Sequence, residues 1–296
     1  MTASEGPFEF TEPVPTLDRP RLLIALQPWI DIGSVGTMAL GFLEQLFGAE
    51  EVAKLSRPGI FYDFSRYRPM LFRREGERHV AVPNTFLRSA RSVDGDWLFL
   101  HALEPHSHGE DFVDGVFGLV RRFGVREYTL IGSMYAPIPH TRPPLASGGA
   151  SSEPLRGRLQ QAGVRESKYE GPTTILATMP QLAAGEGVET GSVIVQLPAY
   201  IQLERDYCGT EALLDILSRV YSLTLNLEPL REESDRQRRA MEESVAQNPQ
   251  LQAMVSELER AYDSDAPHEN DEDAPKLSPE LEGFLKDIET RLQNPD

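Results

Sequence analysis

The chain has 296 residues, of which 40% are hydrophobic, and a formal net charge of −17, with −11 of that charge in residues 228–296. This size allows one or two globular domains, and the acidic surface without any basic run argues against nucleic-acid binding. No stretch reaches the roughly 18 apolar residues of a membrane helix, and the acidic, proline-rich N-terminus differs from a secretory signal. The single Cys208 excludes an intrachain disulfide framework. We therefore expect a cytoplasmic protein without a membrane span.

The first half of the chain predicts strands that alternate with helices. Residues 1–20 carry four prolines without apolar periodicity, so we expect an extended arm. The apolar run at residues 21–27 predicts a buried strand, and apolar residues at helical spacing over 35–47 predict the helix that follows. The same pattern returns with a strand over 97–103 and a helix over 112–123.

Three shorter strands are predicted between these two units, at residues 59–65, 69–74 and 78–83. The turn Glu75-Gly76-Glu77 joins the last two, which indicates a β-hairpin.

The second half continues the alternation up to about residue 227. Strands are predicted over 127–133 and 191–201, with helices that start near Glu153 and that carry apolar residues over 213–221. Because parallel strands need crossover connections, this order predicts an α/β domain over residues 21–227, with a mostly parallel sheet between two helical layers.

The remaining chain predicts an appended helical extension. Residues 228–262 are expected to form a helical hairpin, whose second helix begins at Asn248 as N-cap. Residues 263–276 read as an acidic disordered linker, and residues 277–296 as an amphipathic helix. The apolar stripe of this last helix, a candidate partner-binding surface, consists of Leu281, Phe284, Leu285, Ile288 and Leu292. Packing of this stripe against its own domain is the alternative.

Ligands of parallel α/β sheets bind at the carboxyl edge, where the loops after the strands converge. Four loops of this chain are expected to meet there and to form a cleft. Candidate ligand-binding residues in these loops are Asp31, Gly33, Gly36, Glu104, His140 and Arg142. The two glycines could let backbone N–H groups face an anion, although a tight turn between strand and helix explains them equally.

The loop "MYAPIPHTRPP", residues 134–144, holds His140 and Arg142 between four prolines that stiffen it. The two side chains could bind a carboxylate or a phosphate. Alternatively, Arg142 braces the loop through backbone carbonyls.

No motif of high specificity indicates a reaction. The histidines His101, His106 and His108 have acidic neighbours, but their spacing does not enforce convergence on one ion, so we assign no metal and no cofactor. A nucleophile elbow of the G-x-S-x-G type is absent from the sequence. Enzymatic activity is left open, and the sequence favours a protein that is not an enzyme.

An ordered set of segments resembles the proteasome assembly chaperone family, type two, in its bacterial, actinobacterial-type branch. The segments are "PWIDIGSVGTMALGFL", "LEPHSH", "GSMYAPIPHTRPP", "YEGPTTI" and "VQLPAYI". The resemblance implies a sheet like that of nucleoside phosphorylases and hydrolases, and assembly into homo-oligomers. Some relatives end in a hydrophobic-tyrosine-any tripeptide that docks on the proteasome ring, whereas this chain ends "QNPD".

Two hypotheses about function follow. The first is a protein-interaction or assembly-chaperone-like protein that forms a dimer or trimer and engages a protein partner through its C-terminal extension. The second is a binding or hydrolytic protein for a small anionic or nucleoside-like molecule at the carboxyl edge of the sheet. They differ in whether the loop side chains face a closed pocket or are used to hold the structure.

Overall fold

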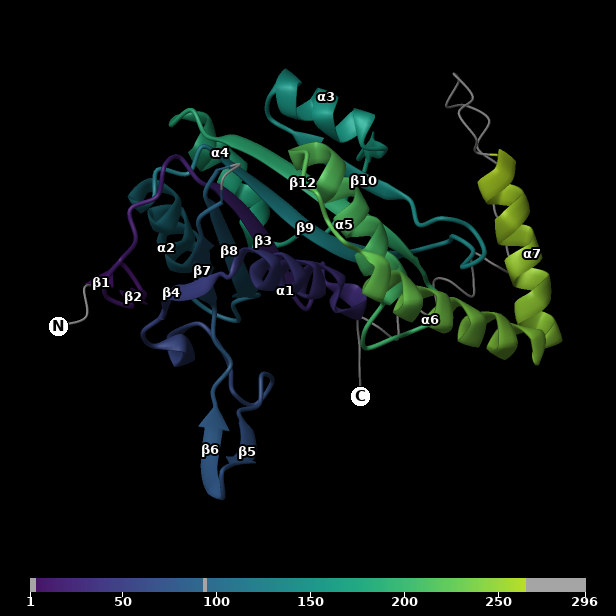
Figure 1. The fold of residues 1–296 in the computed structure, drawn as a ribbon, viewed down its shortest axis with the longest axis horizontal. Helices are drawn as coiled ribbons and strands as arrows, with labels where there is room; N and C mark the ends of the chain where they lie inside the picture. Colours follow the sequence, from purple (N-terminus) through teal and green to yellow (C-terminus); the bar gives the residue numbers. More distant parts are fainter. Residues whose placement is uncertain (1–3, 93–94, 265–296) are drawn as a thin grey trace.

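The computed structural model describes residues 4–92 and 95–264. It contains a ten-stranded mixed sheet covered by helices on both faces, and a separate two-stranded hairpin (Figure 1).

The centre of the large sheet is parallel, as predicted. Its four strands, in spatial order, are β8 (Trp97–Leu103), β3 (Arg21–Gln27), β9 (Glu127–Ala136) and β12 (Glu189–Pro198). In β3, Leu22 pairs with Leu98 of β8 on one side and with Tyr128 of β9 on the other. Because both faces of these strands are covered, they read in the sequence as continuous apolar runs.

The flanks of the sheet are mostly antiparallel, and the sequence pattern did not predict them. They consist of β1 (Ser4–Glu5), β2 (Phe8–Phe10), β4 (Glu50–Leu55) and β7 (Phe86–Ala90) on one side, and of β10 (Ala146–Ala150) and β11 (Val164–Glu166) on the other. The expected N-terminal arm is in fact part of the sheet: β2 pairs with β4, and Phe8 and Phe10 are buried. A strand of three residues is too short for its alternation to be recognised.

Two helical layers cover the sheet and give the predicted three-layer α/β arrangement. One layer contains α2 (Gly109–Arg122), the 3₁₀ turn η3 (Ile175–Thr178) and α4 (Met179–Ala184); the other contains α1 (Val35–Phe47), α3 (Glu153–Gln161) and α5 (Tyr207–Tyr221). The strand alternation divides the core accordingly. Leu22 and Ile24 pack in the cluster with α2, and Leu23 and Ala25 in the cluster with α1 and α5.

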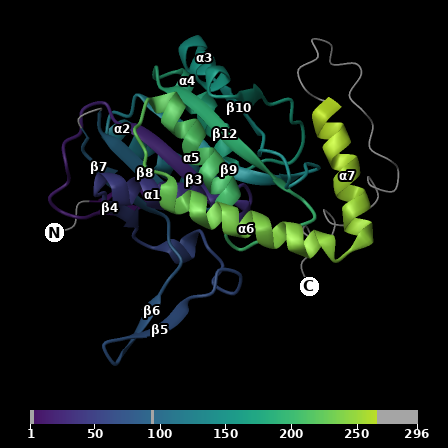
Figure 2. The same ribbon diagram turned by 45° about the vertical axis from the view of Figure 1, so that its right-hand side comes forward.

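The predicted hairpin consists of β5 (Met70–Arg74) and β6 (Glu77–Ala81), and it projects from the body of the molecule (Figures 1 and 2). The prediction of a strand at residues 59–65 is wrong. That segment begins in the 3₁₀ helix η2 (Pro58–Ile60) and continues as turns. Phe61 and Tyr62 are both buried in the same cluster, which the alternation of a strand would prevent.

The last described elements are α6 (Glu228–Ala246) and α7 (Pro249–Ser264). α6 packs against α5, and Asn248 accepts hydrogen bonds from the N–H groups of Gln250 and Leu251, as expected for an N-cap. α7 extends two residues into the predicted linker. The rest of the linker and the predicted helix over 277–296 lie outside the described residues.

Candidate functional site

Asp31 holds the start of α1. Its Oδ1 accepts hydrogen bonds from the N–H groups of Gly36 (2.6 Å) and Thr37 (3.2 Å), and its Oδ2 accepts from Thr37 Oγ1 (2.5 Å) and Gln27 Nε2 (3.2 Å). Burial raises the pKa of Asp31, and these hydrogen bonds partly offset that shift. Both carboxylate oxygens are therefore used to hold the helix start.

The two candidate glycines permit close packing. Gly33, in the 3₁₀ turn η1 (Ile32–Ser34), has a φ of 61°, and a Cβ there would lie 2.7 Å from Cβ of Asp206. A Cβ on Gly36 would lie 2.9 Å from the carbonyl oxygen of Ile131. Since the N–H of Gly36 is already donated to Asp31, the tight-turn interpretation fits these positions better than an anion cradle.

The chain itself fills the space between the carboxyl ends of β3 and β9. The Ile30 carbonyl accepts a hydrogen bond from the N–H of Ser133 (2.8 Å), and the Ile32 carbonyl accepts one from Ser133 Oγ (2.5 Å). The contact is so close that a Cβ on Gly132 would lie 1.8 Å from the Ile30 oxygen. The segment around Ile30 therefore packs directly against the end of β9.

Glu104 follows β8, and its side chain contacts η3 instead of the start of α1. Its Oε1 accepts a hydrogen bond from the N–H of Ile175 (3.1 Å) in η3, which contacts α2. Its Oε2 is buried without a hydrogen-bond partner among the described residues, and burial raises the pKa of this carboxyl. Tyr67 donates its hydroxyl to the Glu104 carbonyl (3.1 Å).

His140 is buried and bound to Tyr200. The Tyr200 hydroxyl oxygen accepts a hydrogen bond from the backbone N–H of His140 (2.8 Å) and lies 2.7 Å from its Nδ1. The imidazole tautomer decides which of these two atoms donates, and Nε2 is buried without a hydrogen-bond partner among the described residues. Burial lowers the pKa of His140, which keeps the ring neutral near pH 7.

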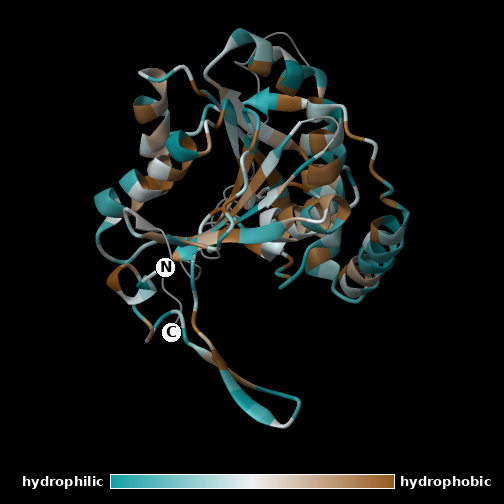
Figure 3. Cartoon of the chain, turned by 60° about the vertical axis from the view of Figure 1, so that its left-hand side comes forward, coloured by the Kyte–Doolittle hydropathy of each residue, from teal (hydrophilic) through white to brown (hydrophobic). Residues whose placement is uncertain are grey.

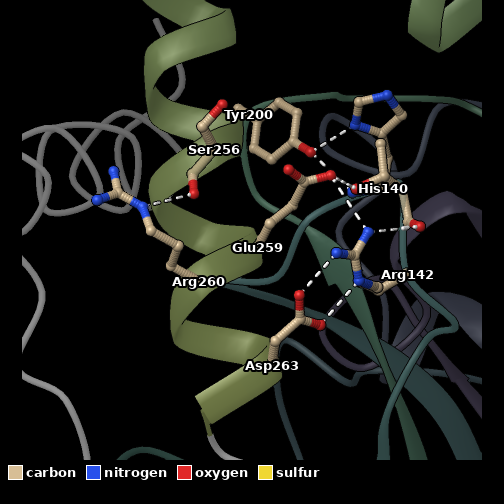
Figure 4. A network of polar contacts seen from close by, with 8 residues as sticks. His140, Arg142, Tyr200, Ser256, Glu259, Arg260 and Asp263 are labelled. Atoms are coloured by element: carbon tan, nitrogen blue, oxygen red, sulfur yellow. Dashed lines mark hydrogen bonds and ion pairs between the residues drawn. The ribbon is translucent and has the colours of Figure 1, made fainter.

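Arg142 attaches α7 to the loop (Figure 4). Its Nε and Nη2 donate to the two carboxylate oxygens of Asp263 at 2.9 and 2.7 Å, and its Nη1 lies 3.3 Å from Oε1 of Glu259. Thr141 donates its hydroxyl to the same Glu259 oxygen (2.5 Å), and Tyr262 donates to the Pro143 carbonyl (3.0 Å). The guanidinium holds the pKa of Asp263 below its usual range. Arg142 thus braces the structure mainly through carboxylates of α7; of the backbone carbonyls that were expected, the described residues supply one, that of Thr141, at 3.4 Å from Nη1.

The three histidines considered for metal binding have separate partners. His101 Nε2 lies 2.6 Å from Glu44, His106 Nδ1 accepts from the N–H of Asp63 (3.2 Å), and His108 lies beside Asp111. Within residues 4–92 and 95–264, no group of three or more His, Cys, Asp or Glu side chains is arranged to hold a metal ion.

A pocket of about 550 Å³ lies between the loop 138–146, α5 and α6. His140 and Arg142 are part of its lining, so two of the six candidate residues meet here; Asp31, Gly33, Gly36 and Glu104 do not line it. Other cationic groups of the lining are paired: Arg231 with Glu211 at 3.4 Å and Arg219 with Asp215.

Cys208 also lines this pocket, at the start of α5. Its thiol contacts Ser234 of α6, and burial raises the pKa of the thiol, so it is not an activated nucleophile.

The hairpin β5–β6 is a surface feature that the sequence pattern placed correctly but did not identify as exposed. Every residue of its two strands is exposed, and Figure 3 shows brown, hydrophobic segments on this projecting element. Its large exposed apolar side chains, with the neighbouring strand end, are Met70, Leu71, Phe72, Val80 and Val82. The available signal was an apolar run without an adjoining helix to cover it.

The candidate partner-binding residues Leu281, Phe284, Leu285, Ile288 and Leu292 lie outside the described residues. None of the helices in the described part of the chain has the length and apolar character needed to span a membrane.

Comparison with known proteins identifies relatives. The sequence model of the PAC2 family matches residues 25–245. Among solved structures, a Mycobacterium tuberculosis protein of unknown function is 26% identical, with a TM-score of 0.77, over 89% of this chain and 94% of that one. A Streptomyces avermitilis PAC2 family protein is 24% identical, with a TM-score of 0.70, over 80% of this chain and 99% of that one. A proteasome-assembly chaperone homologue from M. tuberculosis is also 24% identical, with a TM-score of 0.70, over 79% and 99%. No curated protein sequence matches the chain.

Proposed function

Because the chain belongs to the PAC2 family, as its sequence segments predicted, we propose that it is a self-associating protein-interaction protein with an assembly-chaperone-like role. It forms a dimer or trimer and is not an enzyme. The similarity to the proteasome-assembly chaperone homologue of M. tuberculosis supports the kind of role.

One contrast within the molecule carries this proposal. The loop side chains that would serve a ligand at the strand ends are used to hold the structure, as Asp31 and Arg142 show. The hairpin, by comparison, displays apolar side chains to solvent, and an isolated two-stranded hairpin is marginally stable in water. Exposed apolar surface of this kind marks a protein-interaction site.

The first test is native mass spectrometry of the full-length protein, together with the variant Leu71→Ser/Val80→Ser. These side chains are 57% and 61% exposed, and burying one completely contributes roughly 1.5–3 kcal/mol. Their exposed parts therefore contribute about 2–3 kcal/mol to association, so the double variant should weaken it roughly 30- to 150-fold.

Leu46→Ser is the matched control, because Leu46 is 49% exposed and belongs to α1 rather than to the hairpin. It should leave the subunit number unchanged. A wild-type protein that stays monomeric at micromolar concentration would refute self-association.

A second candidate function is favoured by the pocket between the loop 138–146, α5 and α6. Its volume of about 550 Å³ suits a small ligand, and His140 and Arg142 line it. Binding of a small anionic or nucleoside-like molecule there would require Arg142 to exchange its bonds with α7. A retained small-molecule mass in the native spectrum that disappears in Arg142→Ala would support this function over the first.

Four more detailed predictions from the sequence also belong to the proposal. They are the cytoplasmic location, the likeness of the sheet to that of nucleoside phosphorylases and hydrolases, the division into a domain over 21–227 with a helical extension, and the partner role of the stripe from Leu281 to Leu292.

A further inference from the structure

The two faces of the β5–β6 hairpin differ in chemistry. Cross-strand partners share a face, and the register pairs Leu71 with Val80 and Arg73 with Arg78 on one face. We call these four residues the arginine face. The opposite face carries the Phe72–His79 pair, stacked with ring centroids 5.6 Å apart, and the Arg74–Glu77 pair.

The arginine face contains an electrostatic conflict. Arg73 and Arg78 lie directly opposite each other, and like charges in this position destabilise a strand pair. Neither forms an ion pair with any residue that the structure describes. Residues 66–82 hold five arginines and two glutamates in a chain whose net charge is −17. Carboxylates from another segment would relieve this repulsion.

Next to these arginines, the same face carries two large apolar side chains. Leu71 and Val80 are 57% and 61% exposed, and no helix or sheet in the described part of the chain covers them. An occupant that satisfies the whole face must therefore be amphipathic, with an apolar stripe flanked by acidic side chains.

The chain has such a segment beyond its described part. Residues 265–296 hold ten acidic and three basic residues. If residues 277–296 form the predicted helix, the apolar stripe from Leu281 to Leu292 is flanked by acidic side chains on both sides. These flanking acids are Glu280, Glu282, Asp287 and Glu289.

The positions of α7 and the hairpin allow docking between copies. α7 ends at Ser264, and it leaves the body at a different end from the hairpin (Figures 1 and 2). The twelve residues 265–276 can span up to roughly 40 Å, so the acidic segment is not confined to its own subunit.

We propose that the arginine face of the hairpin binds the acidic C-terminal segment, residues 277–296, of a second copy of this chain. This inference rests on the proposed self-association and names the segment that the hairpin receives.

The test exchanges charges in the full-length chain and measures the dissociation constant of the oligomer by analytical ultracentrifugation. The hairpin variant is Arg73→Glu/Arg78→Glu, and the tail variant replaces Glu280, Glu282, Asp287 and Glu289 with Lys. Each alone should weaken association about tenfold or more, since several ion pairs become like-charge contacts. The two sets combined in one chain should restore it.

Two features of these variants exclude a loss of hairpin stability and a general charge effect as causes of weaker association. The hairpin variant keeps a like-charge pair across the strands, so the hairpin's own stability changes little. The exchange Arg74→Glu/Glu77→Arg moves charge on the opposite face without changing the net charge, and it should leave association unchanged.

Copies labelled with different nitrogen isotopes then distinguish docking between copies from docking within one copy. A carbodiimide reagent that couples amines to carboxylates should join Lys276, next to the docked segment of one copy, to Glu75 in the hairpin turn of another. Cross-links within single copies alone would overturn the proposal.

The possible results distinguish tail docking from self-association through the hairpin. An oligomer that is lost with Leu71→Ser/Val80→Ser but unaffected by the charge exchanges would refute tail docking and retain self-association through the hairpin. A wild-type monomer would refute both.

Discussion

The substitution Gly132→Ala tests whether the chain fills the space between β3 and β9. An alanine Cβ at this position would lie 1.8 Å from the Ile30 oxygen and 3.0 Å from its carbonyl carbon. The segment around Ile30 must therefore move, which breaks the hydrogen bond from the N–H of Ser133.

The expected cost follows from these contacts. Overpacking of a tight site costs about 1–3 kcal/mol, and the lost hydrogen bond adds about 1 kcal/mol. The free energy of unfolding should then fall by about 2–4 kcal/mol, which corresponds for a chain of this length to a Tm lower by about 3–7 °C.

Thermal unfolding followed by circular dichroism at a fixed protein concentration measures this change. Gly149→Ala in β10 is the matched control, because a Cβ there meets nothing within 4 Å. If Gly132→Ala is as stable as the wild type, the segment around Ile30 does not lie against β9, and a ligand cleft at these strand ends becomes tenable again.

Three further outcomes are expected. Arg142→Gln should speed hydrogen exchange of the α7 backbone amides, because it removes the bonds to Asp263 and Glu259. The control Arg260→Gln loses a bond to the Ser256 carbonyl in its own helix and should leave this exchange unchanged. Equal exchange rates in both variants would contradict the attachment of α7 through Arg142. Tyr200→Phe should lower the free energy of unfolding by about 1–3 kcal/mol in urea denaturation, because the N–H of His140 loses its acceptor, and an unchanged midpoint would contradict this bond. Burial raises the pKa of Glu104, so the stability this group contributes is present below its unfolded pKa of about 4.3 and is lost as the pH rises through its folded pKa. Glu104→Gln should therefore gain Tm relative to the wild type between about pH 4 and pH 7, and a constant difference would show that the pKa of Glu104 is the same in both states.

The sequence by itself determined the elements whose pattern is local. The apolar run of β3, the helical spacing of α1 and the turn that joins β5 to β6 each lie within a few neighbouring residues, and the structure has these elements where the pattern predicts them. The family segments are also local and ordered, which is why they indicated the PAC2 family.

Only the tertiary structure decided what the loop side chains do. Arg142 binds Asp263, 121 positions away, and the fit of Ile30 against Gly132 joins segments about a hundred residues apart. The short strand β2 becomes recognisable only through its pairing with β4. Periodicity reports the surroundings within one element, whereas these contacts depend on how elements pack together. The parallel centre of the sheet and the family could therefore be read from the sequence, but the antiparallel flanks, the bonds of the loop side chains and the exposure of the hairpin could not.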